Sequence, residues 1–544
     1  MSARQQVAVV TGGGGGIGAA IAEDLGRTGW FVVTLDPLVT LDGSAQLPEQ
    51  PETTAGRIIA AGGHARASAA SVTDAEAVRA LFHGIFEEHG ALDAVINVAG
   101  ITRQTFFGKG TEEDWRAVLQ VHLGGYLNIL GAALPLMATA GRGTILGVTS
   151  GSGWRAADAG AYSCAKRAVA SLTWQLGRHA PVGVTVNAMS PIAATRMVAA
   201  ALERARQAGR TSGGGISFTT MPGPEDLAPL AAYFVGDDFS WCNGKVLFAG
   251  GSEVAVIDEP RLLEVVRTDG VSSLPRLFES VIPRAFVTAE TKQSSEGGGN
   301  PRFGSIFDEP SSAASDPAPP RGCVIVSDRP RLQASLTSAL EASSFTCHPV
   351  HVEHGFQQAG QALEAIAESS GPVDVIVVAI AGTDHDSADG WEQILAEHSG
   401  IVEGIHTDVS WARAASDYSA HSSRPVQLVT LTDATTSGGR SRAQAVAQHA
   451  RVSVGATEGR VTAFSVSLEA PEVESAQPAS ELVAHLLGNA DLSTLSGAEL
   501  VVGSGWIGLR SHPKPAGSVI YGGPVIPDWL DGTLREIAAT SDRA

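Results

Sequence analysis

Three residues, Ser150, Tyr162 and Lys166, have the types and spacing needed to move a proton on and off an alcohol oxygen. Tyr162 and Lys166 lie four residues apart in AYSCAKRAVA, a segment expected to be helical, so their side chains leave one face of the helix. A phenol has a pKa of about 10, and a neighbouring ammonium group favours the phenolate, so this tyrosine can exchange protons near neutral pH. Ser150 follows an expected strand, and its hydroxyl can hydrogen-bond the same substrate oxygen. Taken alone, a Tyr/Lys pair of this spacing also fits a solvated helix face.

A glycine-rich turn follows the first expected strand and precedes the first expected helix. The turn fits two patterns: TGxxxGxG, with Thr11, Gly12, Gly16 and Gly18, and GxGxxG, with Gly13, Gly15 and Gly18. Bare backbone N–H groups at a helix start, together with the helix dipole, hold a pyrophosphate that side chains would keep away. The position of the turn therefore predicts a dinucleotide site.

An acidic residue, Asp36, ends the second expected strand, some twenty residues past the glycines. A carboxylate there accepts hydrogen bonds from the adenosine ribose hydroxyls and repels a 2′-phosphate. The next residue is Pro37 rather than an arginine. The predicted cofactor is therefore NAD rather than NADP, while the alternative is an aspartate that only initiates a turn before proline.

These candidate residues require a scaffold of alternating strands and helices. The first half has expected strands at Val7–Val10, Phe31–Leu35, Ala94–Asn97, Thr144–Val148, Val184–Ala188 and Val246–Ala249. The second half has them at Cys323–Val326, Val375–Val378, Val426–Leu431, Val461–Val466 and Glu499–Val502. Amphipathic segments such as Thr111–Leu130 lie between the strands. The predicted fold class is α/β, with two doubly wound, parallel-sheet, Rossmann-like domains in tandem.

The domain boundaries follow from composition. Residues 292–320 are rich in Ser, Gly and Pro and too poor in apolar residues to build a core, which predicts a flexible linker. The expected domains are a catalytic NAD-binding domain at 1–258, a connecting segment at 259–320, a second domain at 321–512 and a C-terminal tail at 513–544.

The second half repeats markers of the first, but not its chemistry. Trp115, Leu119, His122 and Gly124 recur at the same mutual spacing as Trp391, Leu395, His398 and Gly400. Asp328 and Pro330 stand where the glycine turn should be, and Asp433 stands at the serine position. The region that corresponds to the Tyr/Lys pair has neither a tyrosine nor a lysine. We predict a degenerate second domain that supplies packing.

The order of the motifs resembles the short-chain dehydrogenase/reductase family over roughly residues 5–255. The matching segments are TGGGGGIG, NVAG at Asn97–Gly100, the serine segment TSGSG, YSCAK and SPIAATRM at Ser190–Met197. The resemblance implies that Tyr162 is the catalytic acid/base, that Lys166 lowers its pKa and holds the nicotinamide ribose, and that Ser150 orients the substrate oxygen. Ser150 is one residue closer to Tyr162 than is common in the family, so the spacing alone does not decide between Thr149 and Ser150. The TSGSG match favours Ser150. The further cofactor contacts implied are Thr11, Gly12, Gly16, Ile17, Gly18, Asp36, Val72, Asn97, Ala99, Gly100, Pro191, Ile192 and Thr195.

One segment departs from the family pattern. Val121-His122-Leu123 stands where the family usually has an asparagine that helps a proton relay to the lysine. The histidine, and the long insertion from Asp36 to about Thr54, are similar to the dehydrogenase part of peroxisomal multifunctional enzymes, which oxidise (3R)-hydroxyacyl-CoA. The resemblance makes His122 a fourth catalytic candidate; the alternative is a hydrogen-bonded core histidine.

The charge and the cysteine content limit the kinds of partner that the protein is expected to bind. Lys and Arg number 37 against 57 Asp and Glu, and the net charge of −20 repels nucleic acids and anionic membranes. The four cysteines are far apart, with no Cys/His cluster at metal-ligand spacing, so no metal is expected. The N-terminal residues show no secretory signal pattern, and we expect a cytoplasmic protein. A homodimer of two-domain chains, resembling the tetramer of the family, is the expected assembly.

Together these features predict an NAD(H)-dependent oxidoreductase that interconverts a secondary alcohol and a ketone, with a hydroxyacyl thioester or another bulky hydrophobic alcohol as substrate. Two alternatives stay open. One is an NADPH-dependent ketoacyl reductase, and the other is a non-catalytic scaffold or sensor that binds NAD.

Overall fold

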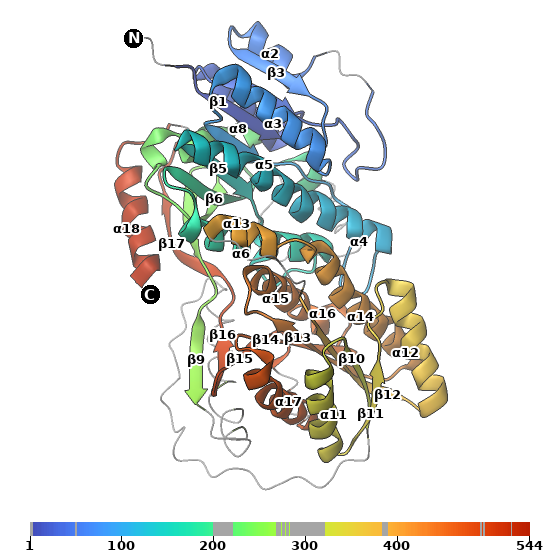
Figure 1. Cartoon of the computed structure of the whole chain (residues 1–544). Coiled ribbons are helices and arrows are strands. Elements are labelled where there is room, and N and C mark those ends of the chain that lie inside the picture. The colour runs from blue at the N-terminus through green and yellow to red at the C-terminus, as the bar shows by residue number, and fades with distance from the viewer. Residues whose placement is uncertain are drawn as a thin grey trace.

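The computed structural model describes residues 4–48, 52–199, 221–267, 321–382, 390–489, 495–523 and 525–543, together with Leu274, Phe278, Ile282 and Leu492 as single residues. The predicted linker at 292–320 lies outside the described residues. Two sheets, one above the other in Figure 1, are each covered by helices on both faces.

The upper sheet has nine strands in the order β17-β8-β7-β6-β5-β4-β1-β2-β3. Seven of them are parallel: β1 (Val7–Thr11), β2 (Phe31–Leu35), β3 (His64–Ser68), β4 (Ala94–Asn97), β5 (Gly143–Val148), β6 (Val184–Pro191) and β7 (Val246–Gly250). Strand β8 (Glu253–Asp258) pairs antiparallel with β7. The helices are α1 (Gly16–Arg27), α2 (Thr54–Ala60), α3 (Ala75–His89), α4 (Glu112–Leu119), α5 (Gly125–Ala140), α6 (Ala161–His179) and α8 (Pro224–Val235).

The two faces of this sheet are both apolar, as a doubly covered parallel sheet requires. In β1, Val7 and Val9 belong to the core beneath α3, α5 and α6, whereas Ala8 and Val10 belong to the core beneath α1 and α8. Side chains alternate between the faces of a strand, so consecutive apolar residues fill both cores. The continuous apolar runs that predicted these strands therefore have a direct packing reason.

The lower sheet has eight strands in the order β11-β10-β12-β13-β14-β15-β16-β9. Six are parallel: β10 (Arg321–Ser327), β11 (Phe345–Val350), β12 (Val373–Ile380), β13 (Val426–Asp433), β14 (Val461–Leu468) and β15 (Glu499–Gly503). Its helices are α11 (Pro330–Ala342), α12 (Phe356–Ser370), α13 (Gly390–Glu397), α14 (Ile401–Ser422), α15 (Ser437–Ala450), α16 (Ser453–Ala456) and α17 (Glu472–Gly488). The predicted fold class, two doubly wound parallel sheets in one chain, is confirmed.

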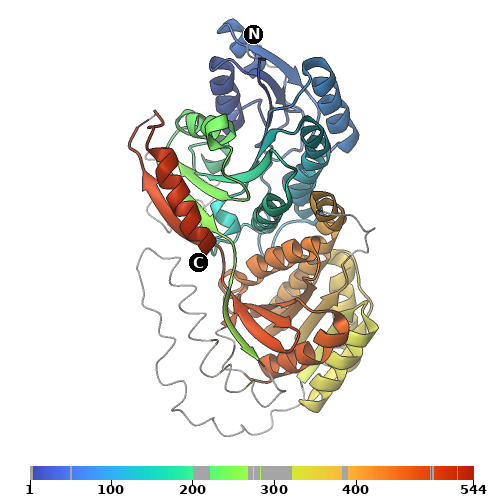
Figure 2. The same ribbon diagram turned by 60° about the vertical axis from the view of Figure 1, so that its left-hand side comes forward.

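The two halves exchange strands, which the predicted boundaries did not anticipate. Strand β9 (Leu262–Arg267), placed in the connecting segment by the sequence, pairs with β16 (Trp506–Arg510) in the lower sheet. Strand β17 (Lys514–Ile520) and helix α18 (Leu530–Arg543), placed in the tail, return to the upper sheet, where β17 pairs with β8. Figure 2 shows α18 and β17, in red, lying beside the green strands of the first half. Strands β9 and β17 are thus structural parts of the opposite halves, because each completes a sheet edge.

The halves also share a hydrophobic core. Helix α6 lies along α15, and α4 contacts α14. Ile401, Ile405 and Val409 of α14 belong to the same buried cluster as the first-half helices. The second half is therefore packed directly against the helix that carries Tyr162 and Lys166.

One helical stretch, Glu112–Ala140, is the single one in the described part of the chain with the length and apolar character needed to cross a membrane. It comprises α4, the π-helical residues Gln120–Gly124, and α5. Of its most apolar window, 67% is buried inside the protein. That burial is expected of a core helix.

Candidate active site

The three residues with acid/base potential meet at the carboxyl edge of the upper sheet. Ser150 follows the end of β5, while Tyr162 and Lys166 lie on the first two turns of α6. The chain turns into α6 at Gly160, whose φ of +51° and close approach to Thr105 leave no room for a side chain. Burial raises the pKa of Tyr162, and its hydrogen bond with Ser150 opposes that rise. The serine predicted to orient the substrate thus contacts the predicted acid/base.

Lys166 is held beneath the tyrosine. Its ammonium group donates to the carbonyl of Val148 at 2.6 Å and lies 5.6 Å from the centre of the Tyr162 ring. The side chain is buried, and this burial lowers the pKa of Lys166 to about 7. Its charge state therefore changes within the pH range where the tyrosine is expected to act.

The lowered pKa of Lys166 has a consequence for stability. Between about pH 7 and pH 10.5, the unfolded chain binds a proton at this amine that the folded chain has lost, so stability rises with pH over that window. Below pH 7 both states are protonated and the contribution stays constant. Relative to Lys166→Met, the wild type should gain up to about 1.4 kcal/mol per pH unit between pH 7 and 10. Urea unfolding of both proteins at several pH values measures the gain; the exposed Lys109→Met variant should track the wild type. A difference between wild type and Lys166→Met that does not change with pH would contradict this assignment.

His122 also contacts the tyrosine. The histidine lies in the π-helical stretch, with its ring centre 4.9 Å from that of Tyr162 and the two rings edge to face. Its Nε2 atom is 2.8 Å from the carbonyl oxygen of Ile101, and a Cβ atom on Gly100 would lie only 2.4 Å from the ring. Burial, together with the Lys166 charge, lowers the pKa of His122 to about 3. The ring is therefore neutral near pH 7 and has no imidazolium proton to give; it supports the Tyr162 ring, and a part in a relay stays a prediction.

The glycine turn has the shape of a cradle that side chains would fill. Gly12 and Gly16 have φ values of +66° and +55°, which favour glycine. A Cβ atom on Gly18 would lie 2.3 Å from the carbonyl oxygen of Gly12, and one on Gly14 would lie 2.7 Å from Asp36. No side chain caps the start of α1, so its first N–H groups are free of such a partner. The TGxxxGxG pattern thus coincides with the conformational need for glycine, and the cradle fits a dinucleotide.

Asp36 lies beside this cradle and also shapes it. One carboxylate oxygen accepts from the Gly14 N–H at 2.9 Å, and the other accepts from the Leu38 N–H at 2.7 Å. The carboxylate therefore faces the glycine turn, as the nucleotide hypothesis requires. It also forms the local turn that was the alternative interpretation, so the two are compatible.

Several other predicted contacts build the walls of the site. Thr11 is buried and donates to Asn97 at 2.8 Å, while its oxygen accepts from the Ala99 N–H at 3.0 Å. Val72 is buried against Gly125 of α5. The Thr11 hydroxyl and the Val72 side chain thus serve the protein interior, and their contact with a nucleotide stays a prediction.

The remaining predicted residues lie at the same edge of the sheet. Ile17 is in the first turn of α1, Gly100 follows β4, and Pro191 ends β6. Ile192 and Thr195 come next in the chain, where the Ile192 N–H donates to the carbonyl of Ala249. In open α/β sheets this edge, at the carboxyl ends of the strands, is where ligands bind.

Arg196 is a further residue beside the glycine turn that its sequence motif did not indicate. Its exposed guanidinium group lies where a Cβ on Gly15 would come within 3.0 Å, so a positive charge sits over the glycine turn. The signal was present in SPIAATRM, but nothing in the sequence indicated that this arginine returns to the first loop.

The corresponding edge of the lower sheet is filled by ion pairs. Asp328 accepts from the Ala381 N–H at 2.8 Å, and Arg329 contacts Glu472 at 3.0 Å and Asp433 at 3.4 Å. On α15, Arg442 donates to both carboxylate oxygens of Asp408, at 2.6 and 2.7 Å. Side chains therefore occupy the space that the upper sheet leaves to bare glycine backbone.

The first half of the chain is similar to a known protein family. The sequence profile of the family described as short chain dehydrogenase matches residues 6–206. A 3-oxoacyl-[acyl-carrier-protein] reductase of Synechocystis sp. is 33% identical, over 45% of this chain and 98% of its own. A peroxisomal hydratase-dehydrogenase-epimerase of Saccharomyces cerevisiae is 30% identical, over 46% of this chain and 27% of its own.

One solved structure is similar over both halves. The N-domain of a bacterial malonyl-CoA reductase with NADP covers 92% of this chain and 98% of its own, with a TM-score of 0.65 and 15% identity. At that identity the likeness concerns the fold alone. It extends to the arrangement of two sheets within one chain.

Proposed function

This chain belongs to the short-chain dehydrogenase family of nicotinamide-dependent oxidoreductases, and we propose that it interconverts a secondary alcohol and a ketone using NAD(H). The observation that carries the proposal is the assembly of Ser150, Tyr162 and Lys166 beside the glycine cradle. Tyr162 contacts Ser150, so a substrate hydroxyl beside both has a proton acceptor and an orienting group within reach.

Each residue of the site has a separate role in the proposed reaction. In the oxidising direction Tyr162 takes the hydroxyl proton while Ser150 hydrogen-bonds the same oxygen. Lys166, close to the Tyr162 ring, favours the phenolate when it is charged. The glycine turn, with Asp36 and Thr195, would hold a nicotinamide dinucleotide, which when bound supplies the hydride acceptor or donor. His122 keeps the tyrosine ring in place by its edge-to-face contact.

For the substrate we propose a hydroxyacyl thioester or its ketoacyl counterpart. The printed names of two relatives, a 3-oxoacyl-[acyl-carrier-protein] reductase and a peroxisomal hydratase-dehydrogenase-epimerase, support this class. An NADPH-dependent ketoacyl reductase is the second candidate, because Arg196 places an exposed cation over the glycine turn.

The deciding experiment follows absorbance of the reduced cofactor. The protein is incubated with NAD or NADP and with hydroxyacyl thioesters, sterols and small secondary alcohols in turn. We expect turnover with NAD and a hydroxyacyl thioester. Turnover only with NADP would support the ketoacyl reductase, and tight NAD binding without any turnover would support a sensor.

The cofactor preference is tested at Asp36. Wild-type protein should bind NADH at least about tenfold more tightly than NADPH, because a carboxylate facing the turn repels the 2′-phosphate. Asp36→Ser should reduce that ratio to about threefold or less, as measured by fluorescence titration with both reduced cofactors. Asp42→Ser removes an exposed carboxylate from the same insertion and should leave the ratio unchanged. Equal affinity of the wild type for both cofactors would remove the NAD assignment.

We also propose that the second half lacks hydride chemistry and that two chains associate into a four-domain assembly. The ion pairs at the edge of the lower sheet support the first statement. The packing of α6 against α15 supports the second, because one of the helix interfaces expected between subunits is formed within this chain.

A further inference from the structure

The loop that carries Ser150 is held by its carbonyl groups. We call residues 150–155 the serine loop. Four successive carbonyls of this loop, from Ser152 to Arg155, each accept a hydrogen bond from a side chain. The donors are Gln448 to Ser152 at 3.0 Å, Arg167 to Gly153 at 3.4 Å, Arg451 to Trp154 at 3.0 Å, and Gln448 to Arg155 at 2.8 Å.

Three of these four hydrogen bonds come from the second half of the chain. Gln448 lies on α15 and is fully buried, and Arg451 follows at the end of that helix. The remaining hydrogen bond comes from Arg167 of α6, which is itself held by Gln444 of α15, whose oxygen accepts at 2.6 and 2.9 Å. One helix of the lower domain therefore fixes the backbone of the serine loop in the upper domain.

Gln448 is well suited to this task. Only the NH₂ end of an amide donates hydrogen bonds, and two carbonyl acceptors at its nitrogen fix its orientation. The position of the loop backbone in turn affects the Ser150 side chain, because the Ser152 N–H donates to the Ser150 hydroxyl oxygen at 3.3 Å. Ser150 in turn is hydrogen-bonded with Tyr162. A short chain of contacts thus runs from Gln448 through Ser152 and Ser150 to Tyr162.

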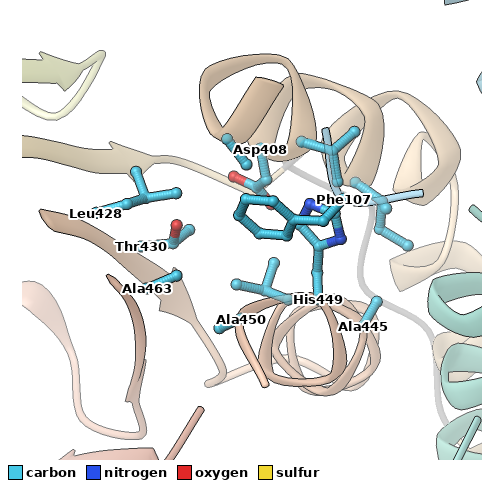
Figure 3. A pocket seen from close by; sticks show the side chains of 12 residues that line it. Phe107, Asp408, Leu428, Thr430, Ala445, His449, Ala450 and Ala463 are labelled. Carbon is cyan, nitrogen blue, oxygen red and sulfur yellow. The ribbon is translucent and has the colours of Figure 1, made fainter. Parts of the chain in front are cut away.

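A second loop beside Tyr162 is anchored in the same domain. Phe107, which follows β4 in the chain, is buried and stacks on His449 of α15 with ring centres 4.5 Å apart. Figure 3 shows the Phe107 ring among side chains of the second half, including Asp408, Thr430 and Ala450. A residue of the first half thus fills a socket in the second.

The anchored loop contacts the segment that leads into α6. The Phe107 N–H donates to the Asp158 carboxylate at 3.0 Å, and Thr105 donates to the carbonyl of Ala159 at 3.4 Å. The same carbonyl accepts from the Tyr162 N–H at 3.1 Å. The socket around Phe107 therefore fixes the entry into the helix that presents Tyr162.

We propose that the second half positions the active site: α15 holds the serine loop through Gln448, and the Phe107 socket holds the segment before Tyr162. This inference rests on the proposed function for its catalytic meaning. Gln448 and Phe107 are positioning residues, since they act through Ser150 and Tyr162.

The test compares two buried glutamines of the same interface. Gln448→Leu keeps the side-chain size but removes both hydrogen bonds to the serine loop. Gln175→Leu is the matched control: Gln175 donates to Ser441 and accepts from Arg440, and contacts neither loop. Both variants lose hydrogen bonds that join α15 to the first half, but only Gln448→Leu loses those to the serine loop.

We expect Gln448→Leu to lower kcat/KM about tenfold or more, because small misplacements of catalytic groups have large effects on rate. The NADH dissociation constant should stay within about twofold, since the glycine turn is not touched. The pH profile should shift to a higher apparent pKa, because Ser150 no longer favours the phenolate of Tyr162. Gln175→Leu should leave kcat/KM and the profile near those of the wild type. Equal losses in both variants would overturn the proposal.

Hydrogen exchange supplies a readout that does not need turnover. In Gln448→Leu, amide exchange in residues 151–156 should rise relative to both the wild type and Gln175→Leu. Phe107→Leu should raise exchange in residues 157–161 in the same way and serves if Gln448→Leu fails to fold. Faster exchange in Gln448→Leu and Phe107→Leu, together with a wild type that never turns over, would support the positioning and remove the oxidoreductase assignment. Unchanged exchange in both loops, with turnover intact, would overturn the positioning alone.

Discussion

Tyr162→Phe is expected to lower kcat by about three orders of magnitude, within the range of roughly 10²–10⁴ that a positioned acid/base contributes. The substitution deletes one hydroxyl and keeps the ring that packs edge to face against His122 and lies near Lys166. The glycine turn is on other elements, so NADH affinity should remain within about twofold of the wild type. Steady-state kinetics with the best substrate, and fluorescence titration with NADH, measure the two effects.

Tyr233→Phe is the matched control for that experiment. Its hydroxyl donates to Asp531 of α18 at 3.0 Å, away from the active site. The control should keep kcat close to that of the wild type even where it lowers thermal stability. If Tyr162→Phe retained most of the turnover, another group would have to be the acid/base, and the assignment of this site would be wrong.

Gly18→Ala is expected to weaken NADH binding by at least about tenfold, the equivalent of about 1.4 kcal/mol. The added methyl group would lie 2.3 Å from the carbonyl oxygen of Gly12. The obstructing atom is backbone, and Gly12 already has a constrained φ of +66°, so the turn cannot yield without changing its shape. Isothermal titration with NADH measures the loss.

Gly84→Ala supplies the control for the glycine experiment. Gly84 lies within α3, and a Cβ atom there would meet no neighbouring atom within 4 Å. Alanine in a helix interior is favoured over glycine by about 0.5–1 kcal/mol, so this variant should be as stable as the wild type or slightly more stable. NADH affinity unchanged in Gly18→Ala would show that the glycine turn does not bind the cofactor.

The second half has a proposed role, the positioning of the serine loop, that its own sheet-edge residues do not indicate. Arg442 and Asp408 close the interior of that half with a buried ion pair, and Arg329 fills the edge of its sheet. Removing one partner of the Arg442–Asp408 pair would leave the other charge buried, which is strongly destabilising. The role that we propose for this half is to hold the serine loop through Gln448 of α15.

Features set by short-range chemistry could be predicted from the sequence. The pairing of Tyr162 with Lys166 on one helix face follows from the helical repeat, and the glycine turn follows from its place between a strand and a helix. The apolar runs of both halves predicted two parallel sheets because a doubly covered strand must be apolar on both faces. Asp36 was placed beside the turn by its position at the end of β2.

Contacts between distant segments could not be predicted. Strands β9 and β17 each complete the sheet of the opposite half, because an open sheet edge is satisfied by any strand within reach and not by sequence proximity. Arg196 reaches the first loop only through the folded order of the strands.

By itself, the sequence determined the chemical groups of the site and the elements that carry them, since these depend on residues a few positions apart. The tertiary structure alone decided that the second half contacts the serine loop: Gln448 donates to the Ser152 carbonyl, and the two residues are separated by 296 residues. No local pattern encodes that hydrogen bond, because its two partners are brought together by the packing of α15 against the first half.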